Sequence, residues 1–134
     1  MIITDVKQID RIAEETFGKR KGFVLVDMKD YTFIKEHSKS LKLIKLDVSA
    51  LTEDVVHSLD DAITEAGKEN VNDVLLYIKG VGNDAGKGAV TIGQLNIFIE
   101  CLNKNIDAAN IIWGMGEGDD NNEYKSILVI LGYL

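Results

Sequence analysis

The sequence contains no proline and only one cysteine, Cys101, among its 134 residues. A single cysteine excludes an internal disulfide and is typical of a reducing compartment, so we predict a cytoplasmic protein. The residues around Cys101 are apolar, whereas a reactive thiolate needs electropositive surroundings, so we expect a buried thiol rather than a nucleophile. The N-terminal residues lack a basic stretch followed by an apolar one, which argues against a signal peptide.

Basic residues are also scarce, because 15 Lys and Arg stand against 22 Asp and Glu, and the formal net charge is -7. Neutralising phosphates requires clustered Lys and Arg, and the one basic cluster, Lys19-Arg20-Lys21, is short. We therefore predict that the chain does not bind nucleic acid. Long apolar runs are missing too. The longest, Val74–Ile78 and Ile127–Leu131, have the length of strands, so we predict no membrane-spanning segment.

What the sequence does contain is an ordinary globular composition, with 46% hydrophobic and 28% charged residues. Helix and strand patterns alternate along it, which predicts one α/β domain over residues 1–134. The expected helices cover 5–17, 52–66 and the segments that begin near 28 and 91. The expected strands cover 23–26, 41–48, 74–78, 110–115 and 125–134.

Three details of these patterns carry expectations about the sheet. Val74–Ile78 is continuously apolar, which predicts a strand covered on both faces or one in the centre of the sheet. The alternation in residues 41–48 slips at Leu43-Ile44, which we interpret as a bulge or bend. The last two strands are joined by the acidic segment 116–124, and this arrangement predicts a C-terminal hairpin with a long tip.

The glycine-rich segment 80–88 joins a strand to a helix, where backbone amides and a helix N-terminus attract phosphate. Its spacing does not match a Walker loop, because Val81 stands where glycine is needed and Gly88 follows the lysine in place of Ser or Thr. A connecting loop is therefore favoured, and a phosphate or small-molecule site is the alternative. The residues that would form this alternative site are Gly80, Gly82, Gly86, Lys87 and Thr91.

The sequence pattern does not assemble a catalytic or metal-binding set. The acidic tip lacks the glycine of an EF-hand loop, with Tyr124 in its place. His37 and His57 lie on different predicted helices without a zinc-like spacing. Asp60 and Asp61 are neighbours on one helix and so point apart. We therefore predict neither a metal nor a cofactor, and no catalytic residues that act within one chain.

Asp27 and Asp30 bracket the start of the helix that begins near residue 28. On spacing alone they are a helix cap and an acid favoured by the helix dipole. The stretch around them, Gly22-Phe-Val-Leu-Val-Asp-Met-Lys-Asp-Tyr-Thr-Phe-Ile34, also resembles the synergy loop of the bacterial tubulin homologue FtsZ, whose pattern is N-x-D-x-x-D. Asp27 and Asp30 fill the acidic positions, and Leu25 stands at the asparagine. The final segment, ANIIWGMGEGDDNNEYKSILVILGY, resembles the end of the FtsZ C-terminal domain.

This resemblance spans residues 22–134, behind an N-terminal helix and turn at 1–21. It implies the fold of the tubulin/FtsZ C-terminal domain, an α/β (α+β sandwich) fold with a mixed, roughly four-stranded sheet packed with helices. In that family GTP is held by a separate N-terminal domain with a GGGTGTG-type loop, which this sequence lacks. The synergy-loop acids of one subunit complete the GTP site of its neighbour. The resemblance thus implies that Asp27 and Asp30 act at most in trans, as half of a GTPase site.

We therefore expect a non-enzymatic protein-interaction module, and the capped helix over 5–17 favours a stand-alone protein over a fragment. Its partner would be an FtsZ-like or tubulin-like GTPase, or a second copy of itself. The contact would use Leu25, Asp27 and Asp30 to cap or modulate a filament. A phosphate or small-molecule binder that uses segment 80–88 is the alternative. An enzyme with sites built across subunit interfaces is a third possibility.

Overall fold

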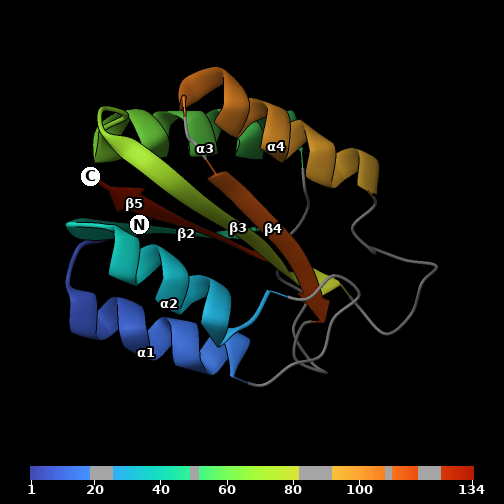
Figure 1. Cartoon of the computed structure of the whole chain (residues 1–134). Helices are drawn as coiled ribbons and strands as arrows, with labels where there is room; N and C mark the ends of the chain where they lie inside the picture. Colours follow the sequence, from blue (N-terminus) through green and yellow to red (C-terminus); the bar gives the residue numbers. More distant parts are fainter. Residues whose placement is uncertain (19–25, 49–51, 82–91, 108–109, 118–124) are drawn as a thin grey trace.

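The structure is a computed structural model that describes residues 1–18, 26–48, 52–81, 92–107, 110–117 and 125–134 (Figure 1). Within these residues the chain forms four helices and five strands. The helices are α1 (Val6–Phe17), α2 (Met28–His37), α3 (Glu53–Ala66) and α4 (Ile92–Asn105). The strands are β1 (Ile2–Ile3), β2 (Ser40–Val48), β3 (Val71–Val81), β4 (Asn110–Glu117) and β5 (Lys125–Tyr133).

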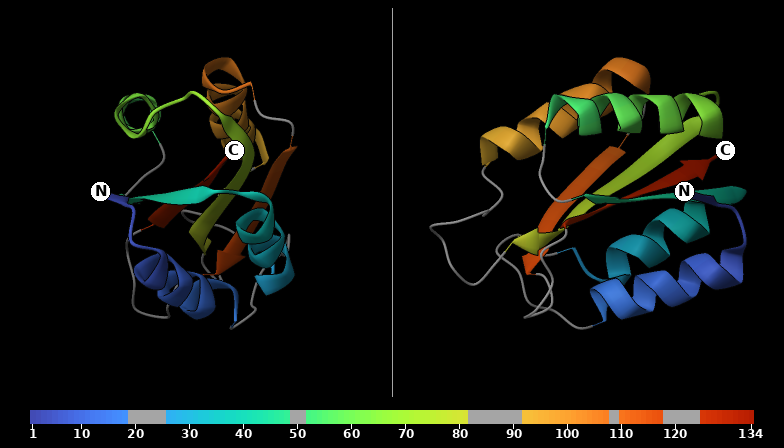
Figure 2. Two further views of the ribbon diagram at one scale, coloured as in Figure 1. Left: turned by 60° about the vertical axis from the view of Figure 1, so that its left-hand side comes forward. Right: turned by 180° about the vertical axis from the view of Figure 1, so that it is seen from behind.

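The sheet lies between two pairs of helices, so the molecule has three layers (Figure 1). The helices α1 and α2 cover one face, while α3 and α4 cover the other. The same layering is visible from the side and from behind (Figure 2). The sheet contains both parallel and antiparallel pairs, so the predicted mixed sheet in an α/β sandwich is confirmed.

The strand order is β1-β2-β5-β3-β4. β5 is central and pairs antiparallel with both β2 and β3, whereas β4 runs parallel to β3. The sheet has one strand more than the roughly four that the resemblance implied, and the predicted strand 23–26 lies outside the described residues except for Val26. The extra strand is β1, which pairs with Leu43 and Ile44 of β2 through only two residues and is too short to leave a sequence pattern.

The predicted C-terminal hairpin is wrong. β3 lies between β4 and β5, so these two consecutive strands are not neighbours in the sheet. α4 instead connects β3 to β4, because parallel strands need a long crossover rather than a tight turn. The start of β4 is fixed where Asp73 and Asn110 face each other in register, and Asn110 Nδ2 donates to Asp73 Oδ1 at 2.8 Å.

Each face of the sheet carries its own hydrophobic core. Successive strand residues point to opposite faces, so Leu43 packs with α1 and α2 while Ile44 packs with α3 and α4. The pairing of β2 with β5 is continuous, so the bulge predicted at Leu43-Ile44 is absent. The apolar alternation slips there because both faces of the strand are buried, and consecutive apolar residues pack on opposite faces. Val74–Ile78 of β3 is also buried on both faces, as predicted.

The helix ends follow from local hydrogen bonding. α1 begins after Asp5, whose carboxylate accepts the backbone N–H of Lys7 at 3.1 Å, and its buried residues are Ile9, Ala13 and Phe17. α3 ends at Gly67, whose φ of 102° lies in the region that favours glycine. The hydroxyl of Tyr133 donates to the carbonyl of Gly67 at 2.8 Å and ties the end of α3 to the end of β5.

Candidate functional site

The N-terminal end of α2 carries the two acids that the sequence singled out. Asp27 is the N-cap, and its Oδ1 accepts the backbone N–H groups of Lys29 at 2.9 Å and of Asp30 at 3.3 Å. In return, Asp30 Oδ2 accepts the backbone N–H of Asp27 at 2.9 Å. This capping box satisfies backbone donors that the first turn of a helix leaves without an intrahelical partner.

The cap uses one oxygen of each carboxylate. Within the described part of the chain, no donor contacts the other oxygens, Oδ2 of Asp27 and Oδ1 of Asp30. Both acids are half-buried, and the capping bonds restrict their side-chain rotamers. The capping bonds therefore hold both carboxylates in place at the end of the helix.

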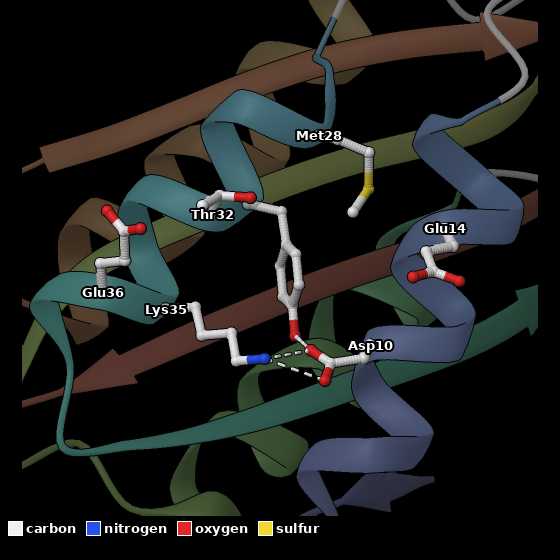
Figure 3. Close-up of a pocket in the computed structure, with 7 residues that line it drawn as sticks. Asp10, Glu14, Met28, Thr32, Lys35 and Glu36 are labelled. Carbon is white, nitrogen blue, oxygen red and sulfur yellow. Dashed lines mark hydrogen bonds and ion pairs between the residues drawn. The ribbon is translucent and has the colours of Figure 1, made fainter.

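A groove between α1 and α2 begins beside this cap, at Met28 (Figure 3). Its volume is about 430 Å³. Acidic side chains outnumber the single lysine among the residues that line it, so the groove favours positive charge. The lining residues are Asp10, Glu14, Met28, Tyr31, Thr32, Lys35 and Glu36.

Asp10 joins the two helices across this groove (Figure 3). Its Oδ1 accepts the Tyr31 hydroxyl at 2.5 Å, and both of its carboxylate oxygens accept Lys35 Nζ at 2.9 Å. The hydrogen bond from Tyr31, followed by that from Lys35, lowers the pKa of Asp10. Burial, followed by the bond to Asp10, raises the pKa of Tyr31. These bonds fix the position of α2, and therefore of its cap, against α1.

Sequence reasoning missed Asp10, Tyr31 and Lys35. Tyr31 and Lys35 are four residues apart and share one face of α2, which is a detectable signal. The identity of their partner is not detectable in this way, because Asp10 lies on another helix and the helical period of α1 marks only its buried stripe.

Of the other predicted site residues, all but one lie outside the described structure. Leu25 lies outside the described residues. The same holds for four residues of the alternative phosphate site, and only Gly80 of that set falls within a described element, β3. The four are Gly82, Gly86, Lys87 and Thr91. The phosphate site therefore stays a prediction.

The described His and Cys side chains are distributed over α2, α3 and α4, and His57 and Cys101 line one hollow between the last two helices. Across the described ranges, no three His, Cys, Asp or Glu side chains come together as a metal site would require. None of the helices in these ranges is both long and apolar enough to cross a membrane. His37 packs on Phe33 of α2, while His57 is exposed on α3 in the opposite layer. Cys101 is buried as predicted, and burial raises the pKa of its thiol.

This arrangement of sheet, helix layers and capped α2 defines a known fold, that of the tubulin/FtsZ C-terminal domain. FtsZ from M. jannaschii matches with a TM-score of 0.62 at 11% identity, over 98% of this chain and 42% of FtsZ. TubZ from Bacillus thuringiensis serovar israelensis, in GDP-form protofilaments, matches with a TM-score of 0.59 at 16% identity, over 98% of this chain and 43% of TubZ. A helical model of a four-stranded TubZ-Bt filament matches with a TM-score of 0.58 at 14% identity, over 98% of this chain and 41% of that chain.

The chain thus spans about two-fifths of the length of these proteins. At such identities the likeness establishes the fold, and the fold implied by the sequence resemblance is confirmed. No protein-family model matches the sequence, and no curated protein matches it either.

Proposed function

We propose that the chain is a protein-interaction module that assembles with a second copy of itself or with an FtsZ- or TubZ-like subunit in the cytoplasm. The observation that supports this most directly is the match over 98% of the chain to TubZ in protofilament form. In this proposal the chain offers a contact surface like that of a filament subunit and caps or modulates a filament.

The contact would be made at the N-terminal end of α2, by Asp27 and Asp30 together with Leu25. The capping box supports this role, because it holds both carboxylates on a helix end before any partner arrives. Binding then costs less side-chain entropy than it would for two freely rotating acids. Alone, the chain would not be an enzyme. Against a partner that carries GTP, the same acids would contribute to hydrolysis in trans.

Two measurements test the proposal. Sedimentation velocity over a concentration series measures self-association, and co-pelleting with polymerising FtsZ or TubZ in the presence of GTP measures binding to a filament. The variant Asp27→Asn/Asp30→Asn removes both charges, while asparagine caps a helix about as well as aspartate. We expect this variant to fold and to lose association by at least about tenfold, because its positioned charges no longer meet their partners.

Asp5→Asn is the matched control. Asp5 caps α1 through the same type of bond, from the N–H of Lys7 at 3.1 Å, so this substitution makes a single Asp-to-Asn change at another helix start. Circular dichroism must show equal helix content in all variants. Unchanged association of Asp27→Asn/Asp30→Asn, or an equal loss in Asp5→Asn, would contradict the proposal.

A further inference from the structure

The helix layer on the far side of the sheet from Asp27 and Asp30 carries an open groove. α3 and α4 lie side by side there (Figure 2). Two hollows of about 240 and 260 Å³ lie between them, and Val56 and Ile97 line both. Because the hollows share these residues, they form one groove, which we call the α3–α4 groove.

The floor of the α3–α4 groove is apolar. Phe98 and Cys101 are buried in it and Val56 is half-buried. Ile97 is 49% exposed, whereas Phe98 and Cys101 on the same helix are buried. Covering such a side chain removes apolar surface from water, which is favourable. The floor therefore suits an aliphatic side chain from outside.

The rim of the α3–α4 groove is acidic. Three acids line it, and Lys104 is the lysine among its lining residues. The three acids are Glu53, Asp60 and Glu100. α3 itself carries five acids and neither Lys nor Arg. A groove with this charge attracts basic groups and repels phosphates.

We propose that the α3–α4 groove binds an amphipathic helix of a partner protein, whose aliphatic side chains are flanked by Lys and Arg. The acidic rim disfavours nucleic acid and anionic membranes, and the net charge of -7 disfavours a second copy of this chain. Along the groove, Glu53 and Asp60 are about 10 Å apart at 1.5 Å per residue of helix. Aliphatic side chains at i and i+7 of a partner helix have the same spacing and fit the two hollows.

The α3–α4 groove is separate from the contact proposed at Asp27 and Asp30, so neither proposal depends on the other. A labelled helical peptide with leucine at i, i+4 and i+7 and with Lys and Arg elsewhere is the probe, and fluorescence anisotropy measures its binding. Its twin has glutamate at every Lys and Arg position. We expect the basic peptide to bind and the acidic twin to stay free.

Ile97→Asp should weaken binding of the basic peptide by at least about tenfold, as for an apolar anchor at the centre of an interface. Phe33→Asp is the matched control, because Phe33 is also a large exposed side chain, at 42%, but lies on α2 in the other layer. The affinity of Phe33→Asp for the basic peptide should equal that of the wild type. Circular dichroism of both variants checks that the exposed substitutions leave the fold intact.

The rim is tested by reversing charges. Glu53→Lys/Asp60→Lys should reduce affinity for the basic peptide by about tenfold and create affinity for the acidic twin. Glu15→Lys/Glu36→Lys makes the same change in net charge on α1 and α2 and should have little effect. Equal losses in the two charge-reversed variants, or in Ile97→Asp and Phe33→Asp, would show nonspecific attraction and overturn the proposal.

The groove also contains its own reporter. Cys101 lines the α3–α4 groove and is the single cysteine of the chain, so the rate of thiol modification by a chromogenic disulfide reagent reports on this site alone. We expect the basic peptide to slow the reaction in the wild type and in Phe33→Asp, but not in Ile97→Asp. An unchanged rate at a saturating concentration of bound peptide would place the peptide elsewhere and refute the assignment.

Discussion

Replacing Tyr31 with phenylalanine removes one hydroxyl from the interface of α1 and α2 and leaves the ring in place. That hydroxyl donates to Asp10 Oδ1 at 2.5 Å, and Tyr31 is 2% exposed. A hydrogen bond to a charged group contributes about 1.5–3 kcal/mol. The side chain of Asp10 is 33% exposed, so water replaces part of the lost bond. We therefore expect Tyr31→Phe to lower the free energy of unfolding by about 1 kcal/mol.

The ion pair between Asp10 and Lys35 offers a comparison at the same carboxylate. The side chain of Lys35 is 43% exposed, and exposed ion pairs contribute about 0–1 kcal/mol. Lys35→Met should therefore lower the free energy of unfolding by about 0.5 kcal/mol or less. The expected order of the two variants identifies the buried hydroxyl, rather than the ion pair, as the main tie between α1 and α2.

Urea denaturation followed by circular dichroism measures both effects. With a slope of about 1–3 kcal/mol/M, Tyr31→Phe should move the midpoint down by about 0.3–1 M. A double-mutant cycle with Asp10→Ala isolates the coupling of Asp10 to Tyr31, which we expect to be about 1 kcal/mol. A coupling of zero, or a larger loss in Lys35→Met than in Tyr31→Phe, would refute the reasoning.

Three further predictions concern the cores and the effect of pH. Gly132→Ala would place a Cβ 2.9 Å from Ile34 Cγ2 and against Ser38 Oγ. Because this overpacks the core, urea denaturation should show that the free energy of unfolding falls by about 1–3 kcal/mol. An unchanged midpoint would contradict this. Phe98 is 1% exposed, so Phe98→Ala would leave a cavity. Calorimetry should show that the free energy of unfolding falls by about 3–5 kcal/mol, and an unchanged value would contradict close packing at this position. Folding lowers the pKa of Asp10 from 3.8, so its carboxylate stabilises the fold above that pH and ceases to do so as the pH falls through the folded value. The stability difference between the wild type and Asp10→Asn should therefore shrink from neutral pH into acid, and a constant difference would contradict the assignment.

The local elements could be predicted from the sequence because each depends on residues close together in the chain. The apolar stripe and terminal glycine of α3 mark that helix, and the continuous apolar run of β3 marks a strand buried on both faces. The spacing of Asp27 and Asp30 indicated a helix cap, and the structure has a capping box there.

The pairing of distant elements could not be predicted in the same way. Two strands separated by an acidic turn are typical of a hairpin, and nothing in residues 110–133 indicates that β3 lies between them. The slip at Leu43-Ile44 was ambiguous for a related reason, because burial on both faces depends on which helices cover the sheet. At the site, Asp10 and Tyr31 are 21 residues apart on separate helices, so their contact depends on packing that local patterns do not encode.

The central position of β5 has a consequence for the synthesis of the protein. On the ribosome, β2 and β3 emerge long before residues 125–133, yet in the finished sheet they are joined only through β5. Until then the edges of β2 and β3 that will face β5 have unpaired backbone N–H and C=O groups, and such edges readily pair with other chains. The nascent chain therefore exposes these strand edges from the time β2 has been made until residues 125–133 follow. If translation stalls before residue 125, β5 is missing, and the pair of β1 and β2 cannot join the pair of β3 and β4 in one sheet.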